Sequence, residues 1–385
     1  MVVEFSKEEI LRYSRHLMIP DVGLEGQKKL KSAAVLLVGA GGLGSPIALY
    51  LAAAGVGRIG VVDYERVDIS NLQRQVLLDT GKVGQPKAES AKERMLAINP
   101  YIQVDAYLEP FNAENGMRIA EPYHILVDGT DNFATRYLVN DICVLTGKPF
   151  VYGAVYRFDG QAAVFDARRG PCYRCLFPRP PWPEDAPTCA EAGVFGVVPG
   201  LVGLVQASET IKLILGVGEP LVSKMLFFNA LDMNFETITL EKNKNCLICG
   251  EHPQIEGLMD YDGFCGTPPV GAAVEEVVSG AEIAPRNLAA RLESGEHLLL
   301  VDVRDPVEAL ISKLPGAVHF PYETLAEHLE QLGGVDREIV VYCRTGVRSA
   351  WAQQMLEQAG FHRVKNLLGG INAWAREVDP TLPQY

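Results

Sequence analysis

A glycine-rich loop that directly follows a buried strand is the feature that most constrains the fold of this chain. Residues 33–38 read Ala-Ala-Val-Leu-Leu-Val, an apolar run typical of a parallel strand covered on both faces. The loop Gly39-Ala40-Gly41-Gly42-Leu43-Gly44 follows, and then a predicted helix through about Ala54. Glycine permits the tight turn and brings backbone N–H groups close to a phosphate at the helix N-terminus. With a second strand over 58–63, the sequence predicts a βαβ unit and a Rossmann-like α/β domain.

The alternation of strands and helices continues beyond this unit. An amphipathic helix is expected over 7–18, ending before Pro20, and another from Gly84-Gln85-Pro86-Lys87 to about Ile98. The further strands that we expect are Gln103–Tyr107, His124–Asp128, 225–230 and 235–240. The α/β pattern therefore accounts for most of the first 250 residues, with a mixed sheet at its centre.

Two stretches lack this alternation. The proline- and arginine-rich stretch 168–188 predicts a long mobile loop, and the Gly/Pro-rich stretch 251–276 predicts an interdomain linker. A smaller α/β pattern follows, with strands at Leu298–Val303 and Ile339–Tyr342. We therefore expect one domain over 1–250, a linker over 251–276 and a second domain over 277–385.

Charge and hydropathy exclude several classes of protein. A formal net charge of −13 disfavours binding to nucleic acid or to an anionic membrane. The apolar stretch Val194–Leu215 contains Pro199, Glu209 and Lys212, so a buried helix is expected there rather than a membrane span. Eight cysteines without an export signal argue for metal or redox chemistry rather than disulfides. We expect a cytoplasmic enzyme.

Polar residues near the glycine loop suggest which nucleotide it binds. Asp63 ends the second strand, where a carboxylate can accept hydrogen bonds from ribose hydroxyls. A dehydrogenase would need a second half with a hydride-transfer site, whereas this chain places Arg74 and Lys87 nearby, two cations suited to a triphosphate. Asp131 follows a strand and offers a hard ligand for Mg²⁺. Any one of these residues would be equally typical of a surface ion pair or a helix cap.

Together these residues carry a resemblance to a known family. The run Gly39–Gly44, Asp63, Ser70–Gln75, Gly84–Lys87 and Asp131-Asn132 resembles the E1-type adenylating enzymes of the MoeB/ThiF family, over about residues 5–250. The resemblance implies ATP- and Mg²⁺-dependent adenylation of the C-terminal glycine of a ubiquitin-like sulfur-carrier protein ending in Gly-Gly. It implies a homodimer in which Arg15 reaches the partner's ATP phosphates. The implied nucleotide-site residues are Gly39, Gly41, Gly42, Gly44, Asp63, Asn71, Arg74, Gln75, Lys87 and Asn132, with Asp131 holding Mg²⁺. Cations would stabilise the leaving pyrophosphate, and the substrate's carboxylate would be the nucleophile, so no base is required.

Two C-x-x-C pairs, Cys172/Cys175 and Cys246/Cys249, suit a closed tetrahedral zinc site. The two pairs are far apart in the sequence, which alone does not show that they meet. A redox pair is the alternative, although neither pair opens a helix in a thioredoxin-like context. The family resemblance places structural zinc at these four positions.

Three further cysteines differ in context. Cys189 lies near a predicted helix start, which lowers the pKa of a thiol; the alternative is a small buried apolar residue. Related adenylating enzymes use a cysteine in this crossover loop for sulfur relay or transient acyl attachment. Cys143 is expected in the core, and Cys265 in the linker has no evident mechanism.

A second chemical motif lies near the end of the chain. Cys343-Arg344-Thr345-Gly346-Val347-Arg348-Ser349 joins a predicted strand to a predicted helix. A loop wrapped around the sulfur would direct N–H groups at it, and with Arg348 would favour a thiolate or persulfide. Cysteine phosphatases use a similar loop, but only four residues separate Cys343 from Arg348, which suits one extra sulfur better than a phosphate. A buried cysteine in a strand-to-helix turn is the structural alternative.

The cysteine loop belongs to a second resemblance. Together with Asp302-Val303-Arg304, Pro315-Gly316-Ala317 and 369–374, it resembles a rhodanese domain over about 277–385; Lys313 stands where that family often has histidine. The resemblance implies sulfur transfer through a Cys343 persulfide, with thiosulfate or a cysteine desulfurase persulfide as donor. The whole chain then resembles an adenylyltransferase and sulfurtransferase that turns a carrier's carboxylate into a thiocarboxylate. An E1-like activator for protein conjugation and a noncatalytic scaffold are the alternatives.

Overall fold

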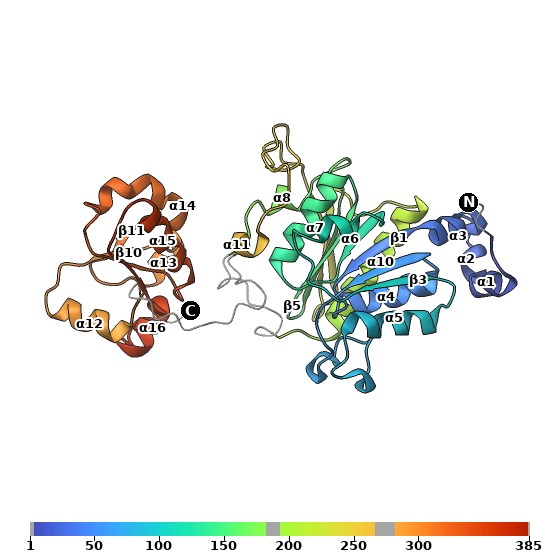
Figure 1. Cartoon of the computed structure of the whole chain (residues 1–385), viewed down its shortest axis with the longest axis horizontal. Helices are drawn as coiled ribbons and strands as arrows, with labels where there is room; N and C mark the ends of the chain where they lie inside the picture. The colour runs from blue at the N-terminus through green and yellow to red at the C-terminus, as the bar shows by residue number, and fades with distance from the viewer. Residues whose placement is uncertain (1–3, 182–192, 266–281, 384–385) are drawn as a thin grey trace. The chain divides into compact units, whose positions relative to one another are not determined.

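The chain folds into two compact units, each with its own sheet. The structure, a computed structural model, describes residues 4–181, 193–265 and 282–383. The first two ranges form unit 1, coloured blue to yellow in Figure 1, and the third forms unit 2, coloured orange to red. Each unit is described by itself.

Unit 1 is built on an eight-stranded mixed sheet in the order β3-β2-β1-β4-β5-β6-β7-β8. The first five strands in this order are parallel, and β6 to β8 continue the sheet as antiparallel neighbours. The strands are β1 (Ala34–Val38), β2 (Arg58–Val62), β3 (Gln103–Tyr107), β4 (Ile125–Asp128), β5 (Phe150–Tyr156), β6 (Asp159–Phe165), β7 (Lys224–Asn229) and β8 (Asn234–Thr239). The predicted Rossmann-like α/β fold with a mixed sheet is confirmed, and the predicted strands lie within one or two residues of the observed ones.

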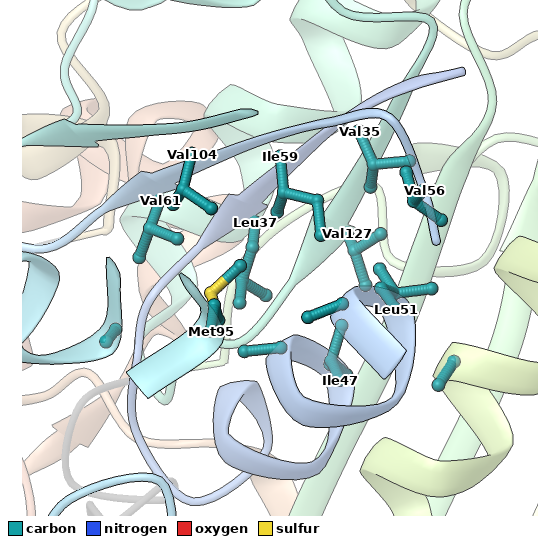
Figure 2. Close-up of a cluster of buried hydrophobic side chains, with 14 of the residues drawn as sticks. Val35, Leu37, Ile47, Leu51, Val56, Ile59, Val61, Met95, Val104 and Val127 are labelled. Carbon is teal, nitrogen blue, oxygen red and sulfur yellow. The ribbon is translucent and has the colours of Figure 1, made fainter. Parts of the chain in front are cut away.

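Helices cover both faces of this sheet because its central strands are apolar on both sides. From β1, Val35 and Leu37 point to the face that also holds Leu51 and Met95, as Figure 2 shows, whereas Leu36 lies in the cluster on the opposite face. Burying one such Leu side chain contributes about 1.5–3 kcal/mol. The helices of unit 1 are α1 (Lys7–Arg12), α2 (Ser14–Leu17), α3 (Gly23–Ser32), α4 (Gly44–Ala54), α5 (Lys87–Ile98), α6 (Gly116–Ala120), α7 (Phe133–Thr146), α8 (Tyr173–Leu176), α10 (Val197–Leu215) and α11 (Tyr261–Cys265).

The helix α10 is long and apolar enough to cross a membrane by length and composition, with a mean hydropathy of 1.3. It packs instead against α4, β5 and β6, and it buries the polar residues Gln206, Glu209 and Thr210. Gln206 donates from Nε2 to the carbonyl oxygen of Asp128, which anchors the helix beneath β4. The prediction of a buried helix in this stretch is confirmed.

Three local predictions differ from the structure. The helix expected over 7–18 is two short helices, because Tyr13 turns out of helical geometry between α1 and α2. The described part of the predicted loop 168–188 contains α8, whose Cys172 end and Tyr173 are buried. The predicted linker contains α11, which packs on α7 and buries Tyr261 and Cys265, so residues up to 265 belong to unit 1. Cys143 is buried in α7, as expected.

Unit 2 is a smaller α/β layer structure. Its five strands are all parallel, in the order β11-β10-β12-β13-β9. They are β9 (Glu282–Ile283), β10 (Leu299–Asp302), β11 (Val318–His319), β12 (Ile339–Tyr342) and β13 (Val364–Leu367). The helices around them are α12 (Pro285–Glu293), α13 (Pro306–Ile311), α14 (Tyr322–Leu325), α15 (Val347–Gln358) and α16 (Gly370–Glu377). Two apolar clusters lie on its two faces, one with Leu356 of α15 and one with Trp374 of α16.

Candidate functional sites

The glycine loop forms the floor of a pocket at the carboxyl ends of β1 and β4. Gly39 has a φ of +95°, and a Cβ built on it would lie 2.7 Å from the carbonyl oxygen of Gly129, in the turn after β4. A Cβ on Gly44 would lie 2.1 Å from the carbonyl oxygen of Gly39. Only glycine allows these two turns and the start of α4 to approach so closely. Neighbouring parallel strands whose connections leave in opposite directions form the usual nucleotide crevice of such sheets.

This pocket has a volume of about 310 Å³ and gathers most of the predicted nucleotide residues. The predicted residues that line it are Gly39, Gly41, Gly42, Asp63, Asn71, Arg74, Gln75, Lys87, Asp131 and Asn132. Gly44 is buried behind the loop, at the start of α4. Arg15 lies exposed on α2 and is not among the lining residues of its own chain.

Asp63 holds the glycine loop against the end of β2. Its Oδ2 accepts the Ala40 N–H at 2.9 Å, and its Oδ1 accepts the Glu65 N–H at 2.9 Å. Burial raises the pKa of the Asp63 carboxyl, and these two backbone donors oppose the rise. The carboxylate predicted to bind ribose therefore also shapes the loop beneath the nucleotide.

The cations and amides of the pocket are already oriented by the protein. Lys87 is buried at the start of α5 and forms an ion pair with Glu65. Arg74 donates from Nη1 to the Ser70 carbonyl oxygen at 3.1 Å. Gln75 is buried, and its Oε1 has no hydrogen-bond partner among the described residues, so it is an acceptor suited to a ligand. Asn132 caps α7 by accepting the Thr135 N–H at 2.8 Å.

Sequence reasoning missed the buried pair that shapes the turn after β4. Asp128 is fully buried; its Oδ1 accepts the Thr130 N–H at 2.9 Å, and its Oδ2 accepts from Arg136 Nε at 3.1 Å. Burial raises the pKa of Asp128, and Arg136 opposes that rise. The turn carries Asp131 into the pocket. The sequence did offer one signal for this pair: Asp128 is an acidic residue at the last position of an otherwise apolar strand, β4.

The two C-x-x-C pairs meet, although 74 residues separate Cys172 from Cys246. Their Sγ atoms are 3.6 Å apart, Cys175 lies 3.4 Å from Cys249, and all four sulfurs lie within 4.8 Å of one another. Tetrahedral Zn–S bonds of about 2.3 Å require S–S distances of about 3.8 Å, so the donor set fits such an ion. Hydrogen bonds to Cys172 and Cys249 lower the pKa of the Cys175 thiol.

A buried brace next to this cluster links three helices. Arg174 of α8 donates from Nε and Nη2 to the two carboxylate oxygens of Asp141 in α7, both at 2.8 Å, and Tyr261 of α11 donates to Asp141 Oδ2 at 2.8 Å. The guanidinium also lies 4.8 Å from the ring centroids of Tyr137 and Phe264. Arg174 stands between two of the clustered cysteines, so the brace fixes the position of that C-x-x-C pair. No local sequence signal pointed to it.

The cysteine loop of unit 2 encloses its sulfur. Cys343 directly follows β12 and is fully buried, and Gly346 donates its N–H to Cys343 Sγ at 3.1 Å. Gly346 has a φ of +100°, which directs this N–H into the loop. A Cβ on Gly370 would lie 2.5 Å from the carbonyl oxygen of Cys343, so the start of α16 closes the loop from the other side. Arg344, Thr345 and Val347 complete the loop and are half-buried.

Arg348, which was predicted to favour a thiolate or persulfide, lies inside unit 2. Its side chain is fully buried and donates to Glu308 Oε2 of α13 at 2.6 Å, with Asp305 Oδ2 at 3.9 Å. Its charge ties the cysteine loop to α13, and Arg344 is the more exposed arginine of the loop.

Cys189 lies outside the described residues. Its predicted role is therefore neither supported nor contradicted by the geometry of the two sites.

Comparison with known proteins finds one family model for each unit. The model of the ThiF family matches residues 13–248, and that of the Rhodanese-like domain matches residues 284–377. The probable adenylyltransferase/sulfurtransferase MoeZ of Mycobacterium tuberculosis is 48% identical over 99% of this chain and 96% of its own. The adenylyltransferase and sulfurtransferase MOCS3 of Mus musculus is 40% identical over 99% of this chain and 88% of its own.

A shorter relative and a solved structure each match about two thirds of this chain. The sulfur carrier protein adenylyltransferase of Thermus thermophilus is 52% identical over 69% of this chain and 99% of its own. The crystal structure of E. coli MccB with AMPCPP and MccA has a TM-score of 0.55 and 24% identity, covering 64% of this chain and 76% of MccB, which shows a shared fold. The chain thus belongs to the ThiF family and carries a rhodanese-like domain after its ThiF domain.

Proposed function

We propose that this enzyme adenylates the C-terminal glycine of a ubiquitin-like sulfur-carrier protein and then replaces the adenylate with sulfur carried by Cys343. The proposal rests on two sites that occur in one chain. One is the pocket lined by the predicted nucleotide residues, and the other is the loop 343–349, here called the cradle, whose Gly346 N–H points at the buried Cys343 sulfur. Relatives that align over nearly the whole chain bear both activities in their names, and one relative is named for a sulfur carrier protein.

In the first reaction, the carrier's terminal carboxylate attacks the α-phosphorus of ATP, the bond from that phosphorus to its bridging oxygen breaks, and pyrophosphate leaves with the electron pair. Arg74 and Lys87 would balance its growing negative charge, and Gln75 Oε1 would accept a hydrogen bond from the nucleotide. Mg²⁺ would be held at the pocket by Asp131 and would supply further charge stabilisation. In a homodimer, Arg15 would come from the second chain, which agrees with its exposed position outside its own pocket.

In the second reaction, the outer sulfur of a Cys343 persulfide attacks the acyl-adenylate carbonyl carbon, and AMP leaves. The product is an acyl disulfide that joins the carrier to Cys343. A thiolate, for which we propose Cys189, then attacks the Cys343 sulfur and releases the carrier thiocarboxylate. The resulting Cys189–Cys343 disulfide would be reduced by an external thiol. The persulfide itself would come from thiosulfate or from the persulfide of a cysteine desulfurase.

We also propose that the four clustered cysteines hold structural Zn²⁺. Four thiolates leave no position open for a substrate, so the ion would contribute to stability and not to the chemistry. The buried brace beside the cluster supports this interpretation, because it fixes α8 between α7 and α11.

The division of labour is tested by changing Cys343→Ala in the full chain. We expect loss of carrier thiocarboxylate, measured by intact mass after incubation with ATP, Mg²⁺ and thiosulfate, because no persulfide can form. ATP–pyrophosphate exchange should persist, since the nucleotide pocket lies in unit 1. Loss of both activities, or carrier attached to protein lysines instead of thiocarboxylate, would contradict the proposal.

A further inference from the structure

Ser349 places a hydroxyl beside the sulfur of Cys343. It lies in the first turn of α15 and is fully buried. Its Oγ is 3.4 Å from Cys343 Sγ and 2.7 Å from Oδ1 of Asn366, a buried residue of β13. A hydroxyl with one proton therefore stands between a sulfur atom and an amide oxygen.

The orientation of Asn366 follows from its other contact. Its Nδ2 donates to the Gly346 carbonyl oxygen at 2.9 Å. Because a carbonyl oxygen only accepts, the amide nitrogen must face Gly346 and the amide oxygen must face Ser349. Asn366 thus holds both the serine hydroxyl and the loop residue whose own N–H points at the sulfur. Strand β13 supports the cradle through this one side chain.

The charged groups around the cradle are largely balanced by one another. Arg348 of α15 is paired with Glu308 of α13, and Arg304 donates to Asp302 of β10 from both Nε and Nη2. Further charged or titratable groups on the surrounding elements are Asp305 at the N-cap of α13, Tyr342 on β12, His319 on β11, Lys365 on β13 and Arg344 in the loop itself. The buried Arg348 and Arg304 are therefore already paired with carboxylates. Stabilisation of a Cys343 thiolate then depends more on neutral hydrogen-bond donors.

We infer that Ser349 is a catalytic residue of the sulfur site: its hydroxyl donates to the Cys343 thiolate and so sets how much reactive thiolate exists at neutral pH. Asn366 is the positioning residue that keeps the hydroxyl within reach. While Cys343 is a thiol, the serine proton points at Asn366; when the sulfur is ionised, the hydroxyl turns to it. The inference rests on the proposed function, in which Cys343 carries the sulfur.

The step that depends on this contact is the loading of sulfur. The Cys343 thiolate attacks the outer sulfur of thiosulfate, a new Sγ–S bond forms, the S–S bond of thiosulfate breaks, and sulfite leaves with the electron pair. No external oxidant or reductant is needed. A hydrogen bond to a charged group is about twice as strong as one between neutral groups, so the serine donor favours the ionised sulfur over the thiol.

The test is the pH dependence of Cys343 alkylation by iodoacetamide in the full chain, followed on the Cys343 peptide by mass spectrometry. We expect Ser349→Ala to raise the apparent pKa by about one unit and to slow alkylation about tenfold at neutral pH. The plateau rate at high pH should not change, because ionisation is then complete. Ser349→Thr, which keeps the hydroxyl, should keep the wild-type pKa.

Ser312→Ala is the matched control, since Ser312 is also buried in unit 2 and its Oγ has no hydrogen-bond partner among the described residues. It should leave the profile unchanged. An unchanged midpoint in Ser349→Ala, or a fall in the plateau alone, would overturn the inference, the latter because it would report a distorted loop. Absence of carrier thiocarboxylate when the unaltered enzyme is given ATP, Mg²⁺ and either thiosulfate or a cysteine desulfurase persulfide would instead count against the proposed function, so the two failures are distinguishable.

Discussion

At the scale of single residues, the nucleotide pocket depends on glycines with different duties. Gly44 is needed for packing, because a methyl group there would meet the carbonyl oxygen of Gly39 at 2.1 Å. Gly41 has room, since the nearest atoms would lie 3.7 Å away, but it lines the pocket. The same glycine motif therefore combines a folding requirement with a binding requirement at separate positions.

These duties can be separated by substitution. We expect Gly44→Ala to lower the free energy of unfolding of unit 1 by about 1–3 kcal/mol, as overpacking does in cores. Gly41→Ala should change that free energy by less than about 0.5 kcal/mol but weaken ATP binding, because its methyl group enters the pocket. Urea denaturation and titration calorimetry would measure the two effects. A larger loss of stability in Gly41→Ala than in Gly44→Ala would show that the loop is packed differently.

Much of the nucleotide pocket could be predicted from the sequence, because neighbouring parallel strands bring their carboxyl ends to the same edge of the sheet. Asp63 and Asp131 could be placed from their positions after strands. The sequence did not predict that both carboxylate oxygens of Asp63 accept backbone N–H groups, since this depends on the exact path of the glycine loop. The burial of Arg348 was equally hidden, because its partner Glu308 lies 40 residues earlier, on α13.

At the scale of secondary structure, short elements are held by tertiary contacts and not by their own sequences. Helices α8 and α11 span four and five residues, too short for a helical period to be visible in the sequence. They form because Asp141 of α7 binds Arg174 of α8 and Tyr261 of α11, next to the cysteine cluster. The helices α4, α5 and α10 and six of the eight strands of unit 1 were predictable, whereas β5 and β6 were not predicted and these two short segments were predicted as a loop and a linker.

The brace predicts a graded loss of stability. Asp141→Ala leaves the buried Arg174 guanidinium without its carboxylate and should cost about 3–5 kcal/mol. Tyr261→Phe removes one hydrogen bond to Asp141 but leaves the ion pair, and should cost about 1.5–3 kcal/mol. The free energy of unfolding from urea denaturation of unit 1 is the measurement. Equal losses in the two variants would mean that the ion pair adds nothing beyond the tyrosine contact.

At the scale of the whole molecule, the chain joins two units that each possess a sheet and apolar clusters on both faces. The nucleotide pocket and the cysteine cluster belong to unit 1, and the sulfur cradle belongs to unit 2. Ligands of one unit should therefore act on its stability without acting on that of the other.

Differential scanning calorimetry tests this independence. Mg²⁺ with a nonhydrolysable ATP analogue at about 100 times its Kd should add about 2.7 kcal/mol to one transition only. A zinc chelator should lower the midpoint of that same transition, and Cys343→Ala should leave it in place. A single transition that moves as a whole with every ligand would show that the two units unfold together.

The complete enclosure of the Cys343 sulfur has a consequence for what can reach it. Bulky thiols are disfavoured at a sulfur with no exposed surface, because they need a wider opening of the loop than thiosulfate or iodoacetamide does. A peptide end made of two glycines has the smallest cross-section that a polypeptide offers. A buried sulfur thus favours slender substrates, so a bare diglycine end should reach it more readily than a chain end that bears side chains.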